Sequence, residues 1–191
     1  MFKELNTLRI FFENPIKEYN VREAAKALGI APATASAHLK QLAKKTIVEE
    51  RKDRMMTLYK ANIDSSAYRD IKTYYNIRLI RESGLLEALN ETYLTPTIVL
   101  FGSMSTGYNY HDSDIDLVVL SIRKGEFPKM DEFTRKLHRE LHIFSVSKLE
   151  DLKNPHLISN VLNGVVLQGQ WTFKSASEKE LFAKFGQIGE K

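Results

Sequence analysis

Two apolar runs separated by a turn-rich segment constrain the fold of this chain more than any other feature. The runs are residues 98–101 (IVLF) and 117–120 (LVVL), and each is typical of a buried strand. The segment between them contains Gly107, Asn109 and Asp112, which are residue types that favour turns. The pattern therefore predicts a strand–turn–strand unit in the core of a domain that contains both helices and strands.

Polar residues stand at the ends of these two predicted strands. Asp114 and Asp116 are two positions apart, so their side chains share one face of a strand. Adjacent carboxylates repel each other, and a divalent cation with a preference for oxygen, such as Mg²⁺ or Mn²⁺, removes that cost. Gly102 lets a phosphate approach the backbone, and Ser103 offers a hydroxyl and the start of a short helix toward Gly107. This equipment suits phosphoryl or nucleotidyl transfer.

The spacing of these residues resembles a known signature. Gly102-Ser103, ten intervening residues and Asp114-Ile115-Asp116 match the pattern of the minimal nucleotidyltransferases of the DNA polymerase beta superfamily, over about residues 75–170. The resemblance implies a domain with a small mixed sheet, in which Gly102 and Ser103 bind the triphosphate and Asp114 and Asp116 bind Mg²⁺ or Mn²⁺. It implies transfer of a nucleoside monophosphate from an NTP, with ATP expected, to an acceptor hydroxyl. Because some such enzymes modify HEPN-domain toxins, a HEPN-domain partner protein is one acceptor to consider.

The family has a third acidic residue on a later strand, and Glu140 is our choice for it. Glu140 precedes the apolar run that begins at Leu141, where it would complete the metal site or act as general base. Relatives often show Val-Asp-Val at this point, whereas this chain has Arg139-Glu140-Leu141. A glutamate at a helix end is the structural alternative. His142 shares the face of Glu140 and is the other residue that could neighbour the site.

A second departure concerns phosphate binding. Many relatives carry an arginine after the Gly-Ser pair, where this chain has Met104, Ser105 and Thr106. This departure favours the competing interpretation, in which the protein is a DNA-binding transcriptional regulator with a nucleotide-sensing or inactive nucleotidyltransferase domain.

The positive charge of the chain belongs to its N-terminal third. The formal net charge is +4, but residues 1–61 contain twelve Lys and Arg against seven Asp and Glu, whereas residues 62–191 contain sixteen against seventeen. An anionic partner is therefore expected at the N-terminal part.

That part resembles the winged helix-turn-helix domains of prokaryotic regulators. Apolar periodicity predicts helices over residues 2–12, 21–28 and 32–42, and a hairpin follows with its turn at Lys52-Asp53. The second helix of the motif and the hairpin would contact DNA. By their position in the motif, the residues expected to contact DNA are Thr34, Ser36, Lys40, Gln41, Lys44, Arg51, Lys52 and Arg54. A module for dimerisation, giving a homodimer, or for protein docking is the alternative use of the same domain.

The expected fold class is therefore α+β, with a winged helix-turn-helix domain (1–61), a helical linker (62–95), an α/β nucleotidyltransferase domain with a small mixed sheet (96–174) and a charged C-terminal tail (175–191). The chain contains no cysteine, which excludes disulfides and thiolate metal sites. No apolar run is long enough to cross a membrane and no secretory signal opens the chain, so a cytoplasmic protein without membrane contact is expected.

Overall fold

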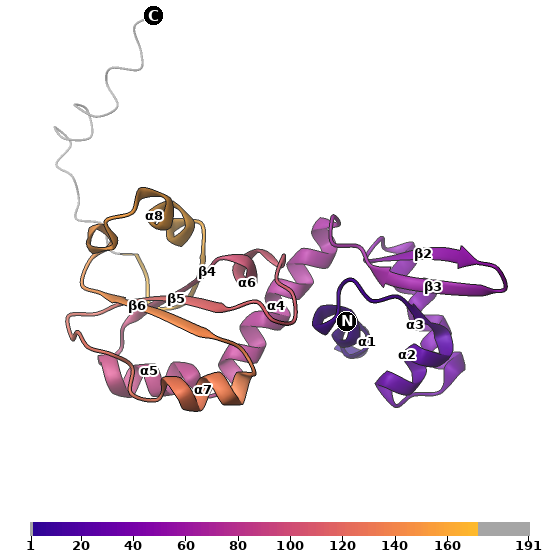
Figure 1. Ribbon diagram of the computed structural model, residues 1–191, viewed down its shortest axis with the longest axis horizontal. Coiled ribbons are helices and arrows are strands. Elements are labelled where there is room, and N and C mark those ends of the chain that lie inside the picture. The colour runs from indigo at the N-terminus through magenta and orange to yellow at the C-terminus, as the bar shows by residue number, and fades with distance from the viewer. Residues whose placement is uncertain (1, 172–191) are drawn as a thin grey trace, which may run out of the picture.

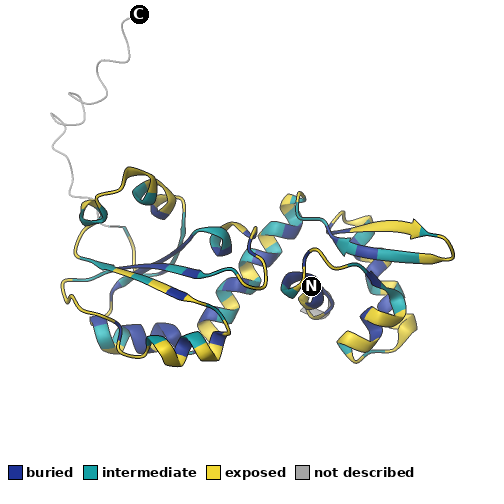
Figure 2. Cartoon of the chain, viewed as in Figure 1, coloured by how far each residue is buried: buried dark blue, intermediate teal, exposed yellow. Residues whose placement is uncertain are grey.

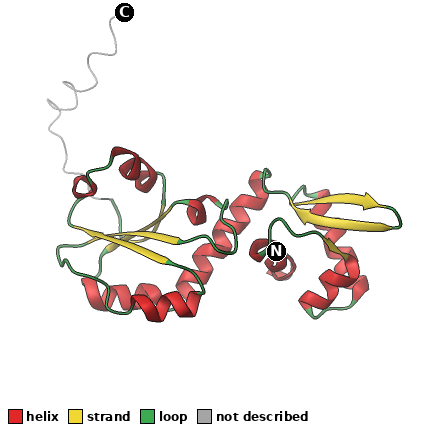
Figure 3. Ribbon diagram, in the orientation of Figure 1, coloured by secondary structure: helices red, strands yellow, loops and turns green. Residues whose placement is uncertain are grey.

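The computed structural model describes residues 2–171, and the expected C-terminal tail at 175–191 lies outside them. The chain forms two lobes, and the long helix α4 (Ser66–Glu82) runs from one to the other (Figure 1). Helices and small sheets occur in both lobes, as the α+β prediction requires (Figure 3).

The N-terminal lobe consists of three helices and a three-stranded antiparallel sheet in the order β1-β3-β2. Its elements are α1 (Phe2–Glu13), β1 (Tyr19–Asn20), α2 (Val21–Leu28), α3 (Pro32–Lys44), β2 (Val48–Asp53) and β3 (Met56–Ala61). The start of α2 is fixed by a capping box, in which Asn20 accepts from two backbone amides and Glu23 accepts from the amide of Asn20. The three helices lie where the apolar periodicity places them.

The hairpin turn lies two residues beyond the predicted position. Asp53 pairs with Met56, so the turn is formed by Arg54 and Met55 rather than by Lys52-Asp53. Arg54 adopts a positive φ of 51°, which two-residue hairpin turns require and which arginine adopts only at some cost. The sequence at this turn contains no glycine or asparagine, so no residue type there predicts the position of the turn.

The C-terminal lobe is built on a four-stranded sheet in the order β6-β5-β4-β7. Strands β5 and β6 run parallel and the other two pairs are antiparallel, which confirms the small mixed sheet. Its elements are α5 (Leu85–Tyr93), β4 (Thr97–Phe101), α6 (Ser103–Thr106), β5 (Ile115–Leu120), α7 (Met130–Leu137), β6 (Leu141–Val146), the 3₁₀ helix η1 (Leu149–Leu152), α8 (Pro155–Leu162) and β7 (Val165–Gln168).

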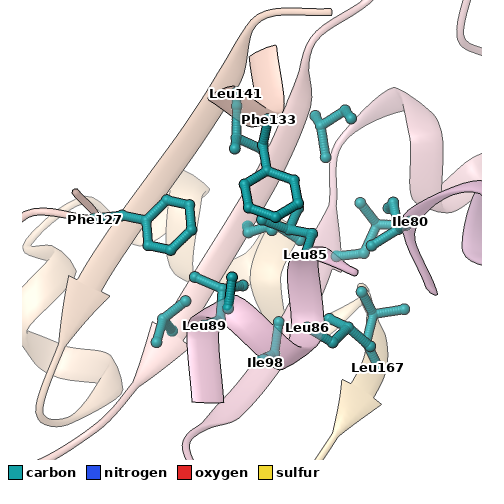
Figure 4. Close-up of a cluster of buried hydrophobic side chains, with 14 of the residues drawn as sticks. Ile80, Leu85, Leu86, Leu89, Ile98, Phe127, Phe133, Leu141 and Leu167 are labelled. Carbon is teal, nitrogen blue, oxygen red and sulfur yellow. The ribbon is translucent and has the colours of Figure 1, made fainter. Parts of the chain in front are cut away.

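Helices cover both faces of this sheet. One face packs against α5, α7 and the end of α4 to form the main core, in which Leu85, Leu89, Ile98 and Phe133 meet (Figure 4). The opposite face packs against α8 through a smaller cluster that includes Phe101. Strands β4 and β5 are consequently buried over most of their length (Figure 2). The free end of the α8-side face is where Asp114 and Asp116 emerge, because Asp116 is the ladder partner of Phe101.

Helix α4 belongs to both lobes. A stripe of buried residues at intervals of four, consisting of Tyr68, Lys72, Asn76 and Ile80, follows one side of the helix. Tyr68 is part of the N-terminal core and its hydroxyl donates to the carbonyl of Phe11, whereas Ile80 is part of the C-terminal core. The segment that we interpreted as a linker therefore contributes to both cores.

Candidate functional site

Gly102 brings the backbone against a carboxylate. It follows β4 with φ of 71° and ψ of −157°, a conformation essentially confined to glycine. A Cβ built at this position would lie 2.5 Å from Oδ2 of Asp116. Only glycine fits both the backbone angles and the space beside this carboxylate.

The expected short helix after Gly102 is present. Helix α6 begins at Ser103, and Gly107 ends it in a left-handed conformation. The hydroxyl of Ser105 donates to the carbonyl of Gly102 at 2.8 Å, and the hydroxyl of Thr106 donates to the carbonyl of Ser103 at 3.1 Å. These two hydroxyls thus stabilise the turn itself. Ser103 remains half-buried at the start of α6.

Asp114 and Asp116 lie beside a histidine. Their side chains are 42% and 26% exposed, and no lysine or arginine within residues 6–171 forms an ion pair with either. Their partner is His142, the residue opposite Asp116 in the parallel ladder of β5 and β6. Its Nδ1 lies 3.1 Å from Oδ1 of Asp116 and 3.9 Å from Oδ2 of Asp114.

Glu140 occupies the position just before β6. Its backbone carbonyl accepts a hydrogen bond from the amide of Ile115 at 2.9 Å, which places it next to Asp114 across the ladder. Its side chain is exposed, and among the described residues it makes no hydrogen bond or ion pair with the two aspartates. The side chain that contacts them is that of His142, and the role of Glu140 stays a prediction.

The loop between α6 and Asp114 is fastened to α4. Gly107 lies so close to the helix that a Cβ would be 2.5 Å from the carbonyl oxygen of Arg69. The amide of Asn76 donates to the carbonyl of Met104 and to the side-chain oxygen of Asn109, both at 2.8 Å. Asn76 and Asn109 are each 1% exposed, so this polar contact is sealed from water.

Lys72 joins the same contact from one turn earlier on α4. It is 1% exposed, and its ammonium donates to the backbone carbonyl of Asn109. Burial lowers the pKa of Lys72 to about 8, and the nearby guanidinium of Arg139 acts in the same direction. The sequence did contain a signal for this residue, because Lys72 and Asn76 interrupt the apolar stripe of α4 at positions that face inward.

Arg139 fastens the last part of the loop. Its guanidinium donates to the carbonyls of Tyr110 at 2.9 Å and of Ser113 at 2.6 Å, immediately before Asp114. Burial lowers the pKa of Arg139, and Tyr75, Asp112 and Asp114 oppose that shift. Sequence reasoning passed over this residue because nothing local connects it with carbonyls 26 and 29 positions away.

The residues expected to contact DNA lie on two elements of the N-terminal lobe. On α3, Thr34, Lys40, Gln41 and Lys44 are exposed and Ser36 is half-buried. Lys44 lies three residues after Gln41 and four after Lys40, and Gln41 lies seven after Thr34, so these side chains share one side of the helix. On the hairpin, Arg51, Lys52 and Arg54 are exposed. Arg51 already forms a bidentate pair with Glu18, with N–O distances of 3.1 and 2.8 Å.

A cavity of about 470 Å³ lies in the N-terminal lobe, away from the aspartates. Residues of α1, the end of α2 and the start of α3 line it, among them Thr7, Leu28 and His38. His38 is half-buried in the lobe, and its Nδ1 lies 2.8 Å from the hydroxyl oxygen of Thr7. The candidate site at Asp114 and Asp116 lies at the start of the inner strand β5 and is not part of this cavity.

Metal binding and membrane insertion are two further points on which the described residues bear. With the side chains as they stand, no three histidine, aspartate or glutamate residues among those described form a group that could hold a metal ion, so Asp114, Asp116 and His142 are not a preformed three-ligand site. No helix within the described residues has the length and apolar character that crossing a membrane demands.

Comparisons with known proteins support one part of the functional interpretation. No curated protein matches the chain. Residues 85–170 match the model of the family described as Polymerase beta, Nucleotidyltransferase. The matched region begins with α5, inside the segment that we interpreted as a linker, and contains the whole four-stranded sheet. The match supports nucleotidyl transfer as the general activity of the C-terminal lobe.

Proposed function

We propose that the C-terminal lobe transfers a nucleoside monophosphate from an NTP, with ATP the first candidate, to an acceptor hydroxyl in the presence of Mg²⁺ or Mn²⁺. The observation that carries this proposal is the position of Asp116, whose carboxylate lies between the backbone of Gly102 and the ring of His142. A carboxylate next to a bare stretch of backbone suits a cation that must also touch a phosphate.

The chemistry of the two carboxylates supports the binding of such a cation. Asp114 and Asp116 are partly exposed, project from one strand face and lack a lysine or arginine counter-ion within residues 6–171. A divalent cation bound to them would neutralise the phosphate charge and activate the leaving and attacking oxygens. Gly102 and Ser103 would position the triphosphate, because the glycine allows close approach of the backbone and Ser103, which is half-buried, carries a hydroxyl donor. Glu140, exposed beside Asp114, is the group we propose to accept the proton of the acceptor hydroxyl.

The loop that joins Gly102-Ser103 to Asp114 and Asp116 would set the distance between the phosphate-binding and metal-binding residues. Lys72, Asn76 and Arg139 together hold the main chain from Met104 to Ser113 at four carbonyls. Transfer depends on positioning far more than on covalent chemistry, so this bracing would matter for rate.

Transfer of label from α-³²P-labelled NTPs tests the function directly. The four NTPs would be incubated with the protein and Mg²⁺ or Mn²⁺, with and without a protein acceptor, of which a HEPN-domain protein is the first candidate. Asp116→Asn is the inactive control, because it keeps the size of the side chain and removes the charge. The transfer proposal would lose its support if no acceptor gave a labelled product and if Asp116→Asn left the affinity for NTP unchanged.

The second candidate is a DNA-binding regulator whose C-terminal lobe senses nucleotide. The exposed row of Lys40, Gln41 and Lys44 on α3 and the positive balance of residues 1–61 favour it. On this view residues 1–61 are a winged helix-turn-helix, and the dimer expected of many regulators would place two copies of α3 on DNA. Salt-sensitive duplex binding that changes with added NTP, without any labelled product, would favour this candidate.

A further inference from the structure

The register between β5 and β6 puts an imidazole where two carboxylates converge. His142 is the direct ladder partner of Asp116, and its Nδ1 contacts oxygens of both Asp114 and Asp116. The histidine side chain is 49% exposed, so burial does not force this contact. A surface histidine next to two aspartates requires an explanation beyond packing.

One of the two distances between these atoms is that of neighbouring metal ligands, and the other is too long as the side chains stand. In an octahedral shell with ligands about 2.1–2.2 Å from the ion, adjacent donor atoms are about 3.0–3.1 Å apart and opposite ones about 4.3 Å. The separation of 3.1 Å between Nδ1 of His142 and Oδ1 of Asp116 corresponds to adjacent positions. The separation of 3.9 Å from Oδ2 of Asp114 lies between the two values, and a small rotation of that partly exposed side chain would close it.

We propose that His142 is the third protein ligand of the cation held by Asp114 and Asp116, and that the site therefore selects Mn²⁺ or a similar first-row dication over Mg²⁺. This inference rests on the proposed function of the same site. Imidazole nitrogen is a good ligand for first-row transition metals, whereas Mg²⁺ strongly prefers oxygen. Two carboxylates and a neutral imidazole also balance the charge of one dication, which a third carboxylate would exceed.

The hydrogen bond between His142 and Asp116 is the structural alternative. In that case the ring would orient the carboxylate from outside and no nitrogen would touch the ion. The two arrangements differ in one measurable property, which is a direct bond between nitrogen and the metal.

Pulsed electron paramagnetic resonance of bound Mn²⁺ measures that property. Electron spin echo modulation from ¹⁴N appears when an imidazole nitrogen is bonded to Mn²⁺. The full chain without a polyhistidine tag would be loaded with one equivalent of MnCl₂, first without NTP and then with a non-hydrolysable ATP analogue. We expect ¹⁴N modulation in the natural protein, its loss in His142→Gln, and its retention in Glu140→Gln and in His156→Gln, which changes an exposed histidine on α8.

Calorimetry of the same proteins tests the selectivity. His142→Gln should weaken Mn²⁺ binding by more than the roughly 10- to 100-fold that follows the loss of an outer-shell partner, and change Mg²⁺ binding less. His142→Asp, which supplies a third carboxylate, should shift the Mn²⁺ to Mg²⁺ affinity ratio toward Mg²⁺.

The possible failures are distinct. Mn²⁺ that binds in an Asp116-dependent way without ¹⁴N modulation would overturn the role of His142 and leave the proposed function intact. Mn²⁺ and Mg²⁺ that do not bind, with or without nucleotide, would overturn both. A ¹⁴N signal that survives His142→Gln would assign the nitrogen to another residue and would also overturn the inference.

Discussion

The ammonium of Lys72 donates a hydrogen bond to the backbone carbonyl of Asn109, 37 positions away in the loop that leads to Asp114. The lysine lies on α4, one turn after Tyr68, which is packed in the N-terminal core. One buried cation thereby connects the helix shared by both lobes with the loop that carries the first aspartate. The surroundings disfavour its charge, because burial lowers the pKa of Lys72 to about 8.

The lowered pKa of Lys72 predicts that the stability of the fold depends on pH. In the unfolded chain the lysine titrates near its ordinary pKa of about 10.5, and in the fold near 8, so the unfolded chain binds more protons between these values. Stability should therefore rise with pH in this window. From pH 7 to 9, the free energy of unfolding of the natural protein should gain about 1 kcal/mol relative to Lys72→Met, measured by urea unfolding.

The comparison with Lys72→Met isolates this residue from other groups. Tyr68, which faces Lys72, has a raised pKa and titrates above this range, so it does not disturb the measurement. Parallel pH profiles for the two proteins would show that Lys72 keeps an ordinary pKa.

Arg139→Lys should loosen the loop before Asp114. Both hydrogen bonds come from Nη1 of Arg139, and the shorter side chain of lysine would not bring its ammonium to the same position, so at least one of the two carbonyls would lose its partner. Hydrogen exchange of the amides at 110–114 should accelerate, corresponding to a local opening that is easier by about 1–3 kcal/mol. Arg135→Lys, an exposed change on α7, is the matched control, and equal exchange in both variants would contradict the bracing role.

Gly102→Ala should damage the site for two separate reasons. The new Cβ would strain the backbone by about 1–3 kcal/mol and would collide with the carboxylate of Asp116. Gly84→Ala also has a positive φ, of 81°, but nothing lies within 4 Å of its Cβ, so it carries the strain without the collision. Both variants should lose thermal stability, and only Gly102→Ala should lose Mn²⁺ binding by calorimetry. If both bind Mn²⁺ equally well, the contact with Asp116 does not shape the site.

Glu18→Gln should strengthen any binding of duplex DNA by the N-terminal lobe. Glu18 neutralises Arg51 through a bidentate pair, and releasing that guanidinium would allow one more phosphate contact. The slope of log affinity against log salt should steepen by about 0.9, measured by fluorescence anisotropy. Glu23→Gln, on the exposed start of α2 and away from Arg51, is the charge-matched control. An identical slope in all three proteins would place the hairpin outside the DNA contact.

Local patterns in the sequence were sufficient to predict the helices and strands and the Gly102 and Asp116 part of the candidate site. The apolar runs at 98–101 and 117–120 lie in β4 and β5, and Gly102 and Asp116 lie side by side at the ends of these strands. The turn of the hairpin was misplaced, because Arg54 adopts a positive φ without the glycine or asparagine that marks such a turn.

Alternation and turn chemistry act between neighbours along the chain, and so the sequence by itself determined the strands, the helices and the shared face of Asp114 and Asp116. The register of β6 against β5 and the packing of α4 against the loop are contacts between distant segments, and only the tertiary structure decided them. They placed His142 rather than Glu140 in contact with the aspartates, and turned Lys72 and Arg139 into supports of the loop. A shift of one residue in a ladder exchanges the side chains on its two faces, which is why this half of the site had no local signature.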